Sequence, residues 1–374
     1  MASLALKWAS KKEGDWSFVL SQIQGIQIAS RKIPSWAVRP LLIYPDKTAL
    51  EQCSSEVTAQ FKSQLMKGKN VADLTGGMGV DSYFIAQQAS QHTYIEPDST
   101  RFEITKHNFE VLGITNTTFL NCTAEEFLAN PSLTSIDCIY VDPSRRNENH
   151  KRVFLLKDMQ PDLELIMNRI RDLHKKMFIK LSPMLDIKAT ISELKNVKTV
   201  YVVSVEDECK ELLFEIDFSF NDSANIQSVN ISNKGTQLLC FTFKEEAETN
   251  LHFSTALKYL YDPFSSLNKA GGYKSIANIF EVSKISQNTH LYTSENLVQN
   301  FFGNCFEIVK VDDFSTKLFP ANEPKKGVIK IRNFKLTQQE IEKKTKITYG
   351  TEYFYFFYSD SQQQLKVATT KKVY

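Results

Sequence analysis

Residues 71–81 have the sequence VADLTGGMGVD, an apolar run that ends at Asp73 and then turns through three glycines. Gly76, Gly77 and Gly79 lack a Cβ atom, so the backbone there can adopt positive φ angles and approach a ligand closely. A helix beginning after this loop would present its N-terminal amides to an anionic group. The stretch therefore predicts a strand, a nucleotide-type cofactor loop and a helix.

Further strand ends carry polar residues suited to a cofactor crevice. Glu96 ends one apolar strand, Thr123 and Ala124 follow a second, and Asp142 ends a third. With the glycine loop, these positions resemble a class I S-adenosylmethionine (SAM) methyltransferase, and the resemblance implies SAM as cofactor. A nicotinamide dehydrogenase also begins with a strand, a glycine turn and a helix, but its fingerprint needs a third glycine where this chain has Ser82.

Composition favours a cytoplasmic globular protein of two or three domains. The 374 residues are 42% hydrophobic and 24% charged, without an apolar run long enough to cross a bilayer or the apolar core of a signal peptide. The six cysteines are scattered, which predicts free thiols and no metal site. The net charge is only +2, but residues 301–374 hold 13 Lys and Arg against 8 Asp and Glu, which hints at a polyanionic partner.

The middle of the chain alternates strand and helix patterns, which predicts an α/β fold with a Rossmann-like, seven-stranded sheet. The expected strands lie near 70–74, 92–96, 117–121, 136–141, 177–181, 198–204 and 211–218. Only Val205 to Lys210 separates the last two, which is too short for a crossover helix and predicts an antiparallel hairpin. Such a hairpin distinguishes the methyltransferase sheet from the dinucleotide-binding sheet.

The flanking regions predict smaller units. Residues 1–45 look largely helical before Pro34 and Pro40, and residues 221–235 are polar and predict a loop or boundary. The proposed apolar face of the N-terminal helix comprises Trp16, Val19, Leu20, Ile23 and Ile26. After the boundary, a strand is expected at Leu238 to Phe243, further strands near 305–311, 327–332 and 351–358, and a charged helix near 337–345. These elements suggest two small α+β units.

The cofactor residues follow from the SAM resemblance. The loop from Asp73 to Gly79, including Thr75, would hold the methionine part of SAM, and Glu96 would accept hydrogen bonds from the ribose hydroxyls. Thr123 and Ala124 would lie near the adenine, although a plain helix start before Glu125 explains them equally well. Methyl transfer is an in-line displacement with a good leaving group, so positioning supplies much of the catalysis.

Asp142 to Arg146 occupies the place where amino-methyltransferases resemble one another in an Asn/Asp-Pro-Pro-aromatic motif. Pro143 restricts the backbone, so that Asp142 can accept hydrogen bonds from a target amino group. Ser144 and Arg145 depart from the motif, which weakens the case for a base stacked there in the usual way. Arg145 and Arg146 could stack as guanidinium planes, grip phosphate, or pair with carboxylates such as Glu51.

The segment after the fifth strand adds candidate site residues. Lys180, Ser182 and Asp186 could face the same pocket as Asp142, because the carboxyl ends of parallel strands line one crevice. Lys180 or Arg145 would hold substrate phosphate; for each residue alone, a capping or loop role is the alternative. Carbon methylation through a cysteine adduct is disfavoured, since the Asp142 loop has no cysteine, but Cys53 remains a candidate from upstream.

Nearly the whole chain resembles bacterial SAM-dependent methyltransferases with a THUMP-like C-terminal domain. The resemblance rests on Lys32 to Trp36, Glu51 to Ser55, Asp73 to Asp81, Asp142 to Arg146, Lys180 to Asp186, Cys209 to Leu213 and His290 to Ser294. It implies an N-terminal helical segment (1–45), a methyltransferase domain (46–222), a ferredoxin-like linking domain (223–298) and a THUMP-like domain (299–374), the last being similar to a type associated with RNA.

The C-terminal portion interleaves basic and aromatic residues, a pattern that can bind phosphates and stack bases. Lys325, Lys326 and Arg332 are the candidate RNA contacts. The sequence thus predicts methyl transfer from SAM to a base nitrogen of RNA, with guanine in tRNA or rRNA as the target. The alternatives are a methyltransferase for a small molecule or protein, and a SAM-binding RNA adaptor without catalysis.

Overall fold

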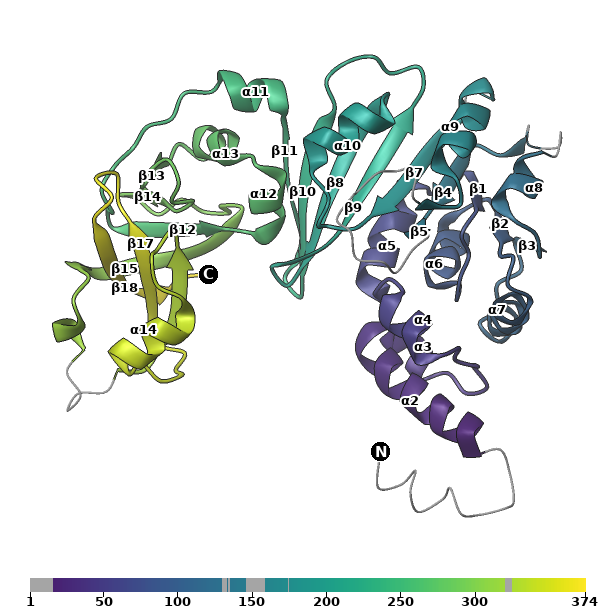
Figure 1. Ribbon diagram of the computed structural model, residues 1–374, viewed down its shortest axis with the longest axis horizontal. Coiled ribbons are helices and arrows are strands. Elements are labelled where there is room, and N and C mark those ends of the chain that lie inside the picture. The colour runs from purple at the N-terminus through teal and green to yellow at the C-terminus, as the bar shows by residue number, and fades with distance from the viewer. Residues whose placement is uncertain (1–15, 130–132, 134, 146–158, 174, 320–324) are drawn as a thin grey trace. The chain divides into compact units, whose positions relative to one another are not determined.

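The computed structural model describes residues 16–129, 133, 135–145, 159–173, 175–319 and 325–374 (Figure 1). The chain forms two compact units. The first comprises residues 1–199 and 211–222, and the second comprises residues 200–210 and 223–374. The domain limits expected from the sequence stay predictions.

Parallel strands form the centre of the first unit. They are β1 (Asn70–Asp73), β2 (Gln91–Ile95), β3 (Thr117–Leu120), β4 (Cys138–Val141) and β7 (Lys176–Leu181). The helices between them are α6 (Val80–Gln88), α7 (Ser99–Val111), α8 (Ala124–Leu128) and α9 (Leu163–Asp172), and α10 (Ile187–Leu194) follows β7. All five strands were predicted from sequence, and their carboxyl ends meet at one edge of the sheet.

The next two strands, β8 (Val197–Val205) and β9 (Glu208–Asp217), form the predicted hairpin. Glu206 and Asp207 join them, both with positive φ, as a tight hairpin turn requires. β9 inserts between β8 and β7 and runs antiparallel to β7. The sheet order is β11-β10-β8-β9-β7-β4-β1-β2-β3. This arrangement confirms the α/β fold class and distinguishes the sheet from a purely parallel dinucleotide-binding sheet.

The prediction of a loop at 221–235 was wrong. β10 (Asn225–Ser232) occupies most of that range and pairs with β11 (Gly235–Thr242). The strand was missed because its polar residues are typical of an exposed loop, whereas in the structure Ser228 and Asn230 are buried. The Asn230 side-chain oxygen accepts hydrogen bonds from the hydroxyl of Ser204 (2.8 Å) and the amide of Asp207 (3.1 Å).

The N-terminal region is helical, as predicted, but its buried face differs. It contains α2 (Trp16–Lys32), α3 (Pro34–Ala37), α4 (Lys47–Gln52) and α5 (Glu56–Leu65); residues 1–15 lie outside the described part. Val19, Ile23 and Ile26 are 40% to 45% exposed, whereas Gly25 and Ala29 are buried. A Cβ on Gly25 would lie 2.5 Å from the Cβ of Tyr44, so a small residue is needed where the helix meets the following segment.

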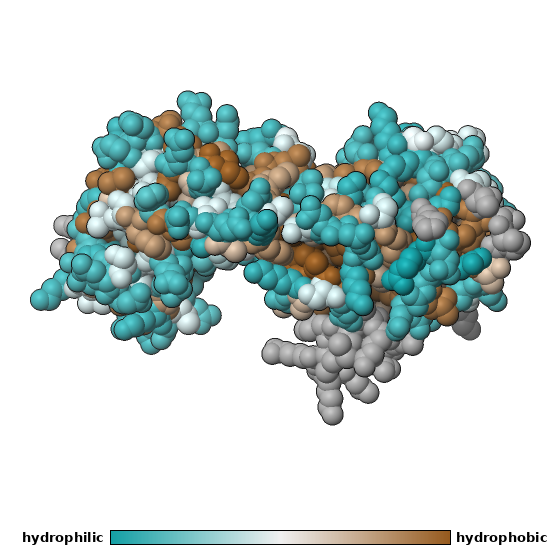
Figure 2. Space-filling view, turned by 90° about the horizontal axis from the view of Figure 1, so that it is seen from above, coloured by the Kyte–Doolittle hydropathy of each residue, from teal (hydrophilic) through white to brown (hydrophobic). Residues whose placement is uncertain are grey.

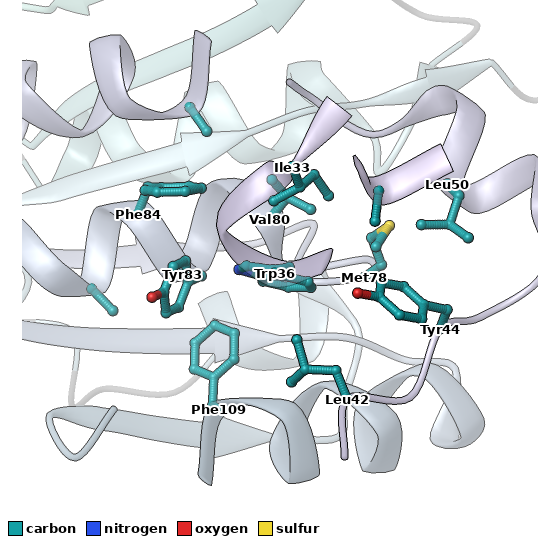
Figure 3. Packing of buried hydrophobic residues seen from close by; sticks show 13 residues of the cluster. Ile33, Trp36, Leu42, Tyr44, Leu50, Met78, Val80, Tyr83, Phe84 and Phe109 are labelled. Atoms are coloured by element: carbon teal, nitrogen blue, oxygen red, sulfur yellow. The ribbon is translucent and has the colours of Figure 1, made fainter. Parts of the chain in front are cut away.

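This N-terminal segment packs directly on the cofactor loop and α6. Trp36, Tyr44 and Leu50 lie in one buried cluster with Met78 of the glycine loop (Figure 3). The Trp36 ring meets the ring of Tyr83 edge-on, with 5.5 Å between their centroids. Burial at roughly 25 cal/mol per Å² of apolar surface makes such a cluster a main source of stability, and here it also fixes the loop.

The second unit contains a seven-stranded sheet of order β13-β14-β12-β15-β18-β17-β16. Its strands are β12 (Tyr259–Pro263), β13 (Ser283–Lys284), β14 (Tyr292–Ser294), β15 (Gly303–Asp313), β16 (Val328–Arg332), β17 (Phe354–Ser359) and β18 (Leu365–Lys372). Its helical elements are α11 (Phe243–Glu248), α12 (Ser265–Ala270), α13 (Tyr273–Ile279), η3 (Thr316–Leu318) and α14 (Gln338–Thr345). The predicted domain limit at 298 therefore falls between strands of one sheet, β14 and β15.

Among the described residues, no helix is both long enough and apolar enough to span a bilayer. Figure 2 shows one face on which hydrophilic residues predominate and hydrophobic residues form smaller patches between them.

Candidate active site

Asp73 begins the cofactor loop at the end of β1 and is fully enclosed. Its carboxylate accepts hydrogen bonds from the amide of Thr75 (2.9 Å) and the hydroxyl of Ser82 (2.6 Å). Burial raises the pKa of Asp73 to about 7, despite these hydrogen bonds, which favour the charged form. Ser82, which stands where the dehydrogenase fingerprint has a glycine, lies in α6, so its hydrogen bond to Asp73 joins α6 to the start of the loop.

The three glycines serve different purposes. A Cβ on Gly76 would lie 2.2 Å from the ring of Tyr94, so this position has no room for a side chain. Gly77 and Gly79 have φ angles of +56° and +79°, in the left-handed region that favours glycine. The Gly77 carbonyl accepts hydrogen bonds from the hydroxyls of Tyr94 (2.6 Å) and Thr105 (3.2 Å), which hold the turn in place.

Glu96 lies at the end of β2 and contacts the same loop. One carboxylate oxygen accepts from the amide of Gly77 (2.8 Å) and the other from the amide of Asp98 (2.9 Å). A carboxylate has further lone pairs and can also accept from ribose hydroxyls. Gly79 precedes α6 without a side-chain cap, which leaves the helix start suited to an anionic carboxylate. The residues present therefore fit the chemistry of SAM.

Thr123 and Ala124 lie where a strand ends, but Thr123 has a structural task. Its side chain caps α8 and forms a capping box with Glu126. Ala124 is buried at the first position of that helix. The alternative interpretation, a plain helix start, therefore accounts for the Thr123 hydroxyl, and the predicted adenine contact stays a prediction.

Asp142 follows β4 and lies beside the cofactor loop. Its amide donates a hydrogen bond to the hydroxyl of Thr75 (2.7 Å), and its carboxylate lies 2.5 Å from Nζ of Lys180. The side chain of Asp142 is 37% exposed, against 12% for Lys180. The carboxylate is thus fixed on one side and accessible on the other.

The rest of the predicted acceptor motif is described in part. Pro143 is partly buried, and Ser144 is exposed in the short strand β5 (Ser144–Arg145), which pairs with β6 (Met159–Gln160). For Arg145 the structure describes the backbone alone, and Arg146 lies outside the described residues. Their predicted roles stay predictions.

Behind Asp142, the structure assembles a buried network of charges that alternate in sign. Lys180 contacts Asp81 (3.5 Å), Asp81 contacts Lys62 (3.1 Å), and Lys62 contacts Glu211 (2.9 Å). The side chains of Asp81, Lys62 and Glu211 are 10%, 0% and 7% exposed. The network therefore extends from a fully enclosed pair to the accessible carboxylate of Asp142.

Ser54 closes this network. Its hydroxyl donates to Asp81 (2.7 Å) and accepts from both Lys62 (2.9 Å) and Lys180 (3.0 Å). The hydroxyl of Tyr140 donates a further hydrogen bond to Asp81 (2.8 Å). A serine hydroxyl has one hydrogen and two lone pairs, so all its hydrogen-bonding capacity is used.

The network also shifts the pKa values of Asp81 and Lys180. Burial alone would raise the pKa of Asp81, but Lys62 and Lys180 outweigh it and leave that pKa below the ordinary value. Burial alone would lower the pKa of Lys180, but Asp142 and Asp81 outweigh it and raise that pKa. Lys180 is therefore a permanent cation at neutral pH.

Lys180 was predicted to hold substrate phosphate, and the structure argues against that role. Its ammonium contacts Ser54, Asp81 and Asp142, which accounts for its three hydrogens. Asp186 caps α10 by accepting from the amide of Ala189 (2.8 Å), and the Ser182 hydroxyl accepts from the amide of Met184 (3.3 Å). For Ser182 and Asp186 these contacts match the capping or loop alternative.

Cys53 lies next to the network residue Ser54, but it is a poor nucleophile. Burial raises the pKa of its thiol to about 11, so the thiol is protonated at neutral pH. Its Sγ lies 3.1 Å from the carbonyl oxygen of Leu50, as a hydrogen-bond donor. These contacts disfavour a covalent adduct through Cys53.

Of the C-terminal candidates, Arg332 has a clear structural partner. Its guanidinium binds both carboxylate oxygens of Asp262 (each 2.7 Å), and Asp262 is fully buried. An RNA contact through Arg332 is therefore not supported. Lys326 is exposed, and Lys325 is partly exposed, with Nζ 5.0 Å from the ring centroid of Phe319.

Sequence reasoning did not select five residues of the site. They are Ser54, Lys62, Asp81, Tyr140 and Glu211. Ser54, Asp81 and Glu211 fall within segments on which the family resemblance rests, so that resemblance was an available signal. Lys62 and Tyr140 lie in an ordinary helix pattern and an ordinary strand pattern, so the sequence gave no signal that they belong to the site.

Comparisons with known proteins agree with this fold. A crystal structure of a "putative methyltransferase" from Porphyromonas gingivalis superposes with a TM-score of 0.88 at 29% identity, and the match covers 98% of this chain and 93% of that one. A family model described as a ferredoxin-like domain matches residues 259–301.

Curated relatives show a more limited similarity. Uncharacterised SAM-dependent methyltransferases from two strains of Mycobacterium tuberculosis are 26% identical over 140 residues. The match spans 37% of this chain and 37% of each relative's length. Over that part of its length, this chain is therefore similar to SAM-dependent methyltransferases.

Proposed function

We propose that this protein transfers a methyl group from SAM to a base nitrogen of RNA, with guanine in tRNA or rRNA as the target. The observation that carries the proposal is the Asp142 carboxylate. This carboxylate is held by Lys180 on one side and accessible on the other, and the backbone amide of Asp142 donates a hydrogen bond to Thr75 of the glycine loop.

Asp73, Glu96 and the glycine loop would hold SAM, which supplies an electrophilic methyl group when bound. The residues of this chain then position the acceptor. The Asp142 carboxylate accepts hydrogen bonds from N–H groups and so aims a nitrogen lone pair. Lys180 contacts that carboxylate at 2.5 Å and limits its rotation.

The donor pattern of guanine supports it as the target. Its N1–H and N2–H₂ groups are adjacent donors, and a carboxylate offers two acceptor oxygens at matching spacing. The corresponding edge of adenine combines a donor with an acceptor, which a carboxylate anion cannot satisfy. Asp142 therefore favours guanine on hydrogen-bonding grounds.

The second unit supports RNA as the substrate class. Lys325 and Lys326 adjoin β16, in a region where basic residues outnumber acidic ones. Lysines that are exposed or partly exposed, as Lys326 and Lys325 are, suit phosphate contacts. We assign this unit the THUMP-like role of holding RNA, and we place the reaction in the cytoplasm.

The test is transfer of labelled methyl from SAM to small and ribosomal RNA from cells that lack the protein. Wild type should label one RNA, Asp142→Ala should not, and digestion to nucleosides should show a methylguanosine. Asp137→Ala is the matched control, because Asp137 is an exposed carboxylate just before the other end of β4.

Two results would overturn the proposal. If wild type binds SAM but labels no RNA, the substrate is a small molecule or protein, or the protein is an RNA adaptor. If wild type and Asp142→Ala label RNA equally, Asp142 does not orient the acceptor.

A further inference from the structure

We infer that Lys62 is a positioning residue for methyl transfer, acting through Asp81 and Lys180 on Asp142. The inference rests on the proposed function and adds a residue that does not touch the substrate. Lys62 lies in α5 and its side chain is 0% exposed, so its effect must pass through its neighbours.

The energetics of burial indicate that this charge pair is not present for stability alone. Taking an ammonium out of water costs several kcal/mol, which ion pairing repays only in part. Buried ion pairs can often be replaced by apolar residues without loss of stability. The Lys62–Glu211 pair is instead connected through Asp81 and Lys180 to the Asp142 carboxylate, so its position bears on the proposed site.

The geometry shows how Lys62 would act. Asp81 uses one carboxylate oxygen for Lys62 (3.1 Å) and the other for Lys180 (3.5 Å). The longer second contact leaves Lys180 free to bind Asp142 closely, at 2.5 Å. Without Lys62, the Asp81 carboxylate can turn fully towards Lys180 and draw its ammonium away from Asp142.

Ser54 helps to keep Lys62 and Lys180 on the two different oxygens of Asp81. The Ser54 hydroxyl contacts both Lys62 and Lys180. Ser54 itself lies just before Ser55, the residue that caps the N-terminus of α5. Glu211 anchors the other side of Lys62 with both carboxylate oxygens at 2.9 Å. Lys62 is thus held from both ends, as a residue that sets the position of its neighbours should be.

The test uses the full-length double variant Lys62→Met/Glu211→Gln. Replacing Lys62 alone would leave Glu211 buried without its ion-pair partner and could prevent folding, whereas the double change removes one cation and one anion together. Lys47→Met/Glu51→Gln is the matched control, because those residues form an ion pair in the same unit with side chains 55% and 57% exposed.

We expect kcat for RNA methylation to fall about 10- to 100-fold in the Lys62 double variant, as a misplaced reacting group would give. KM for RNA and Kd for SAM should stay within about threefold, because neither binding surface is changed. The Lys47 double variant should keep wild-type values. A folded Lys62 double variant that keeps wild-type kcat would overturn the inference whatever its melting temperature, since a merely structural role changes stability and leaves kcat unchanged.

A second readout does not depend on RNA. Crystal structures of wild type and the Lys62 double variant should show the Lys180–Asp142 contact lengthening beyond the hydrogen-bond limit of about 3.5 Å in the variant. An unchanged contact would overturn the inference whatever the substrate is. Failure of wild type to methylate RNA would overturn the proposed function, while this structural comparison would still decide the role of Lys62.

Discussion

The hydroxyl of Thr75 accepts a hydrogen bond from the amide of Asp142 at 2.7 Å, which joins the glycine loop to the residue that we propose orients the methyl acceptor. The same hydroxyl lies 3.2 Å from the carboxylate of Asp73 and can donate to it. Thr75 therefore spans the ends of two adjacent parallel strands, β1 and β4. The two halves of the predicted site depend on one side chain.

Thr75→Val should disconnect these halves while keeping the side-chain shape. The partly buried Asp142 amide would lose its acceptor, which costs about 1 kcal/mol. We expect kcat to fall by about tenfold or more and Kd for SAM to change less, as measured by single-turnover kinetics and calorimetry. Thr75→Ser keeps the hydroxyl and should retain most activity; equal losses in both variants would contradict this role.

Replacing the loop glycines by alanine should give unequal effects. In Gly76→Ala, the new Cβ meets the Tyr94 ring at 2.2 Å, so the loop or the strand must shift. In Gly77→Ala, the nearest atom is 3.7 Å away, and the cost is the positive φ alone, about 1–2 kcal/mol. Calorimetry should therefore show a larger loss of SAM affinity for Gly76→Ala. The reverse order would mean that the Gly77 site is the more crowded one when SAM is bound.

Asp73 should make stability depend on pH between about 4 and 7. Its folded pKa of about 7 exceeds the ordinary 3.8, because burial favours the protonated form. That contribution is complete below pH 4 and is lost as the pH rises to 7, on the order of 4 kcal/mol by linkage. Denaturant unfolding should show wild type losing stability relative to Asp73→Asn across this range. Parallel stability curves would contradict the raised pKa.

The strand ends could be predicted from sequence because their pattern is local. Asp73, Glu96 and Asp142 each follow a short apolar run, and the rule that parallel strands share a carboxyl edge brings them together. The hairpin of β8 and β9 was predictable for the same reason, since the segment between them is too short for a crossover.

The charged network could not be predicted in this way, because its pairings are long-range. Lys62 and Glu211 are 149 positions apart, and a lysine on a predicted helix is ordinarily a solvated residue. The prediction of the buried face of α2 was wrong for a related reason. Val19, Ile23 and Ile26 have core spacing, but close packing against Tyr44 needs the small residue Gly25 instead.

RNA binding should separate the lysines of the second unit from Arg332. Lys325→Ala/Lys326→Ala should weaken RNA binding at low salt and reduce the slope of log K against log salt by up to about 2, since each phosphate contact contributes nearly one counterion. Arg332→Met should instead destabilise the unit by about 3–5 kcal/mol, because Asp262 would be left buried without its bidentate partner.

Filter binding across a salt series and denaturant unfolding would measure both effects. Arg332→Lys should recover part of the lost stability, because an ammonium keeps the charge but not the two-point contact. An unchanged salt slope in the lysine double variant would mean that Lys325 and Lys326 do not contact phosphate.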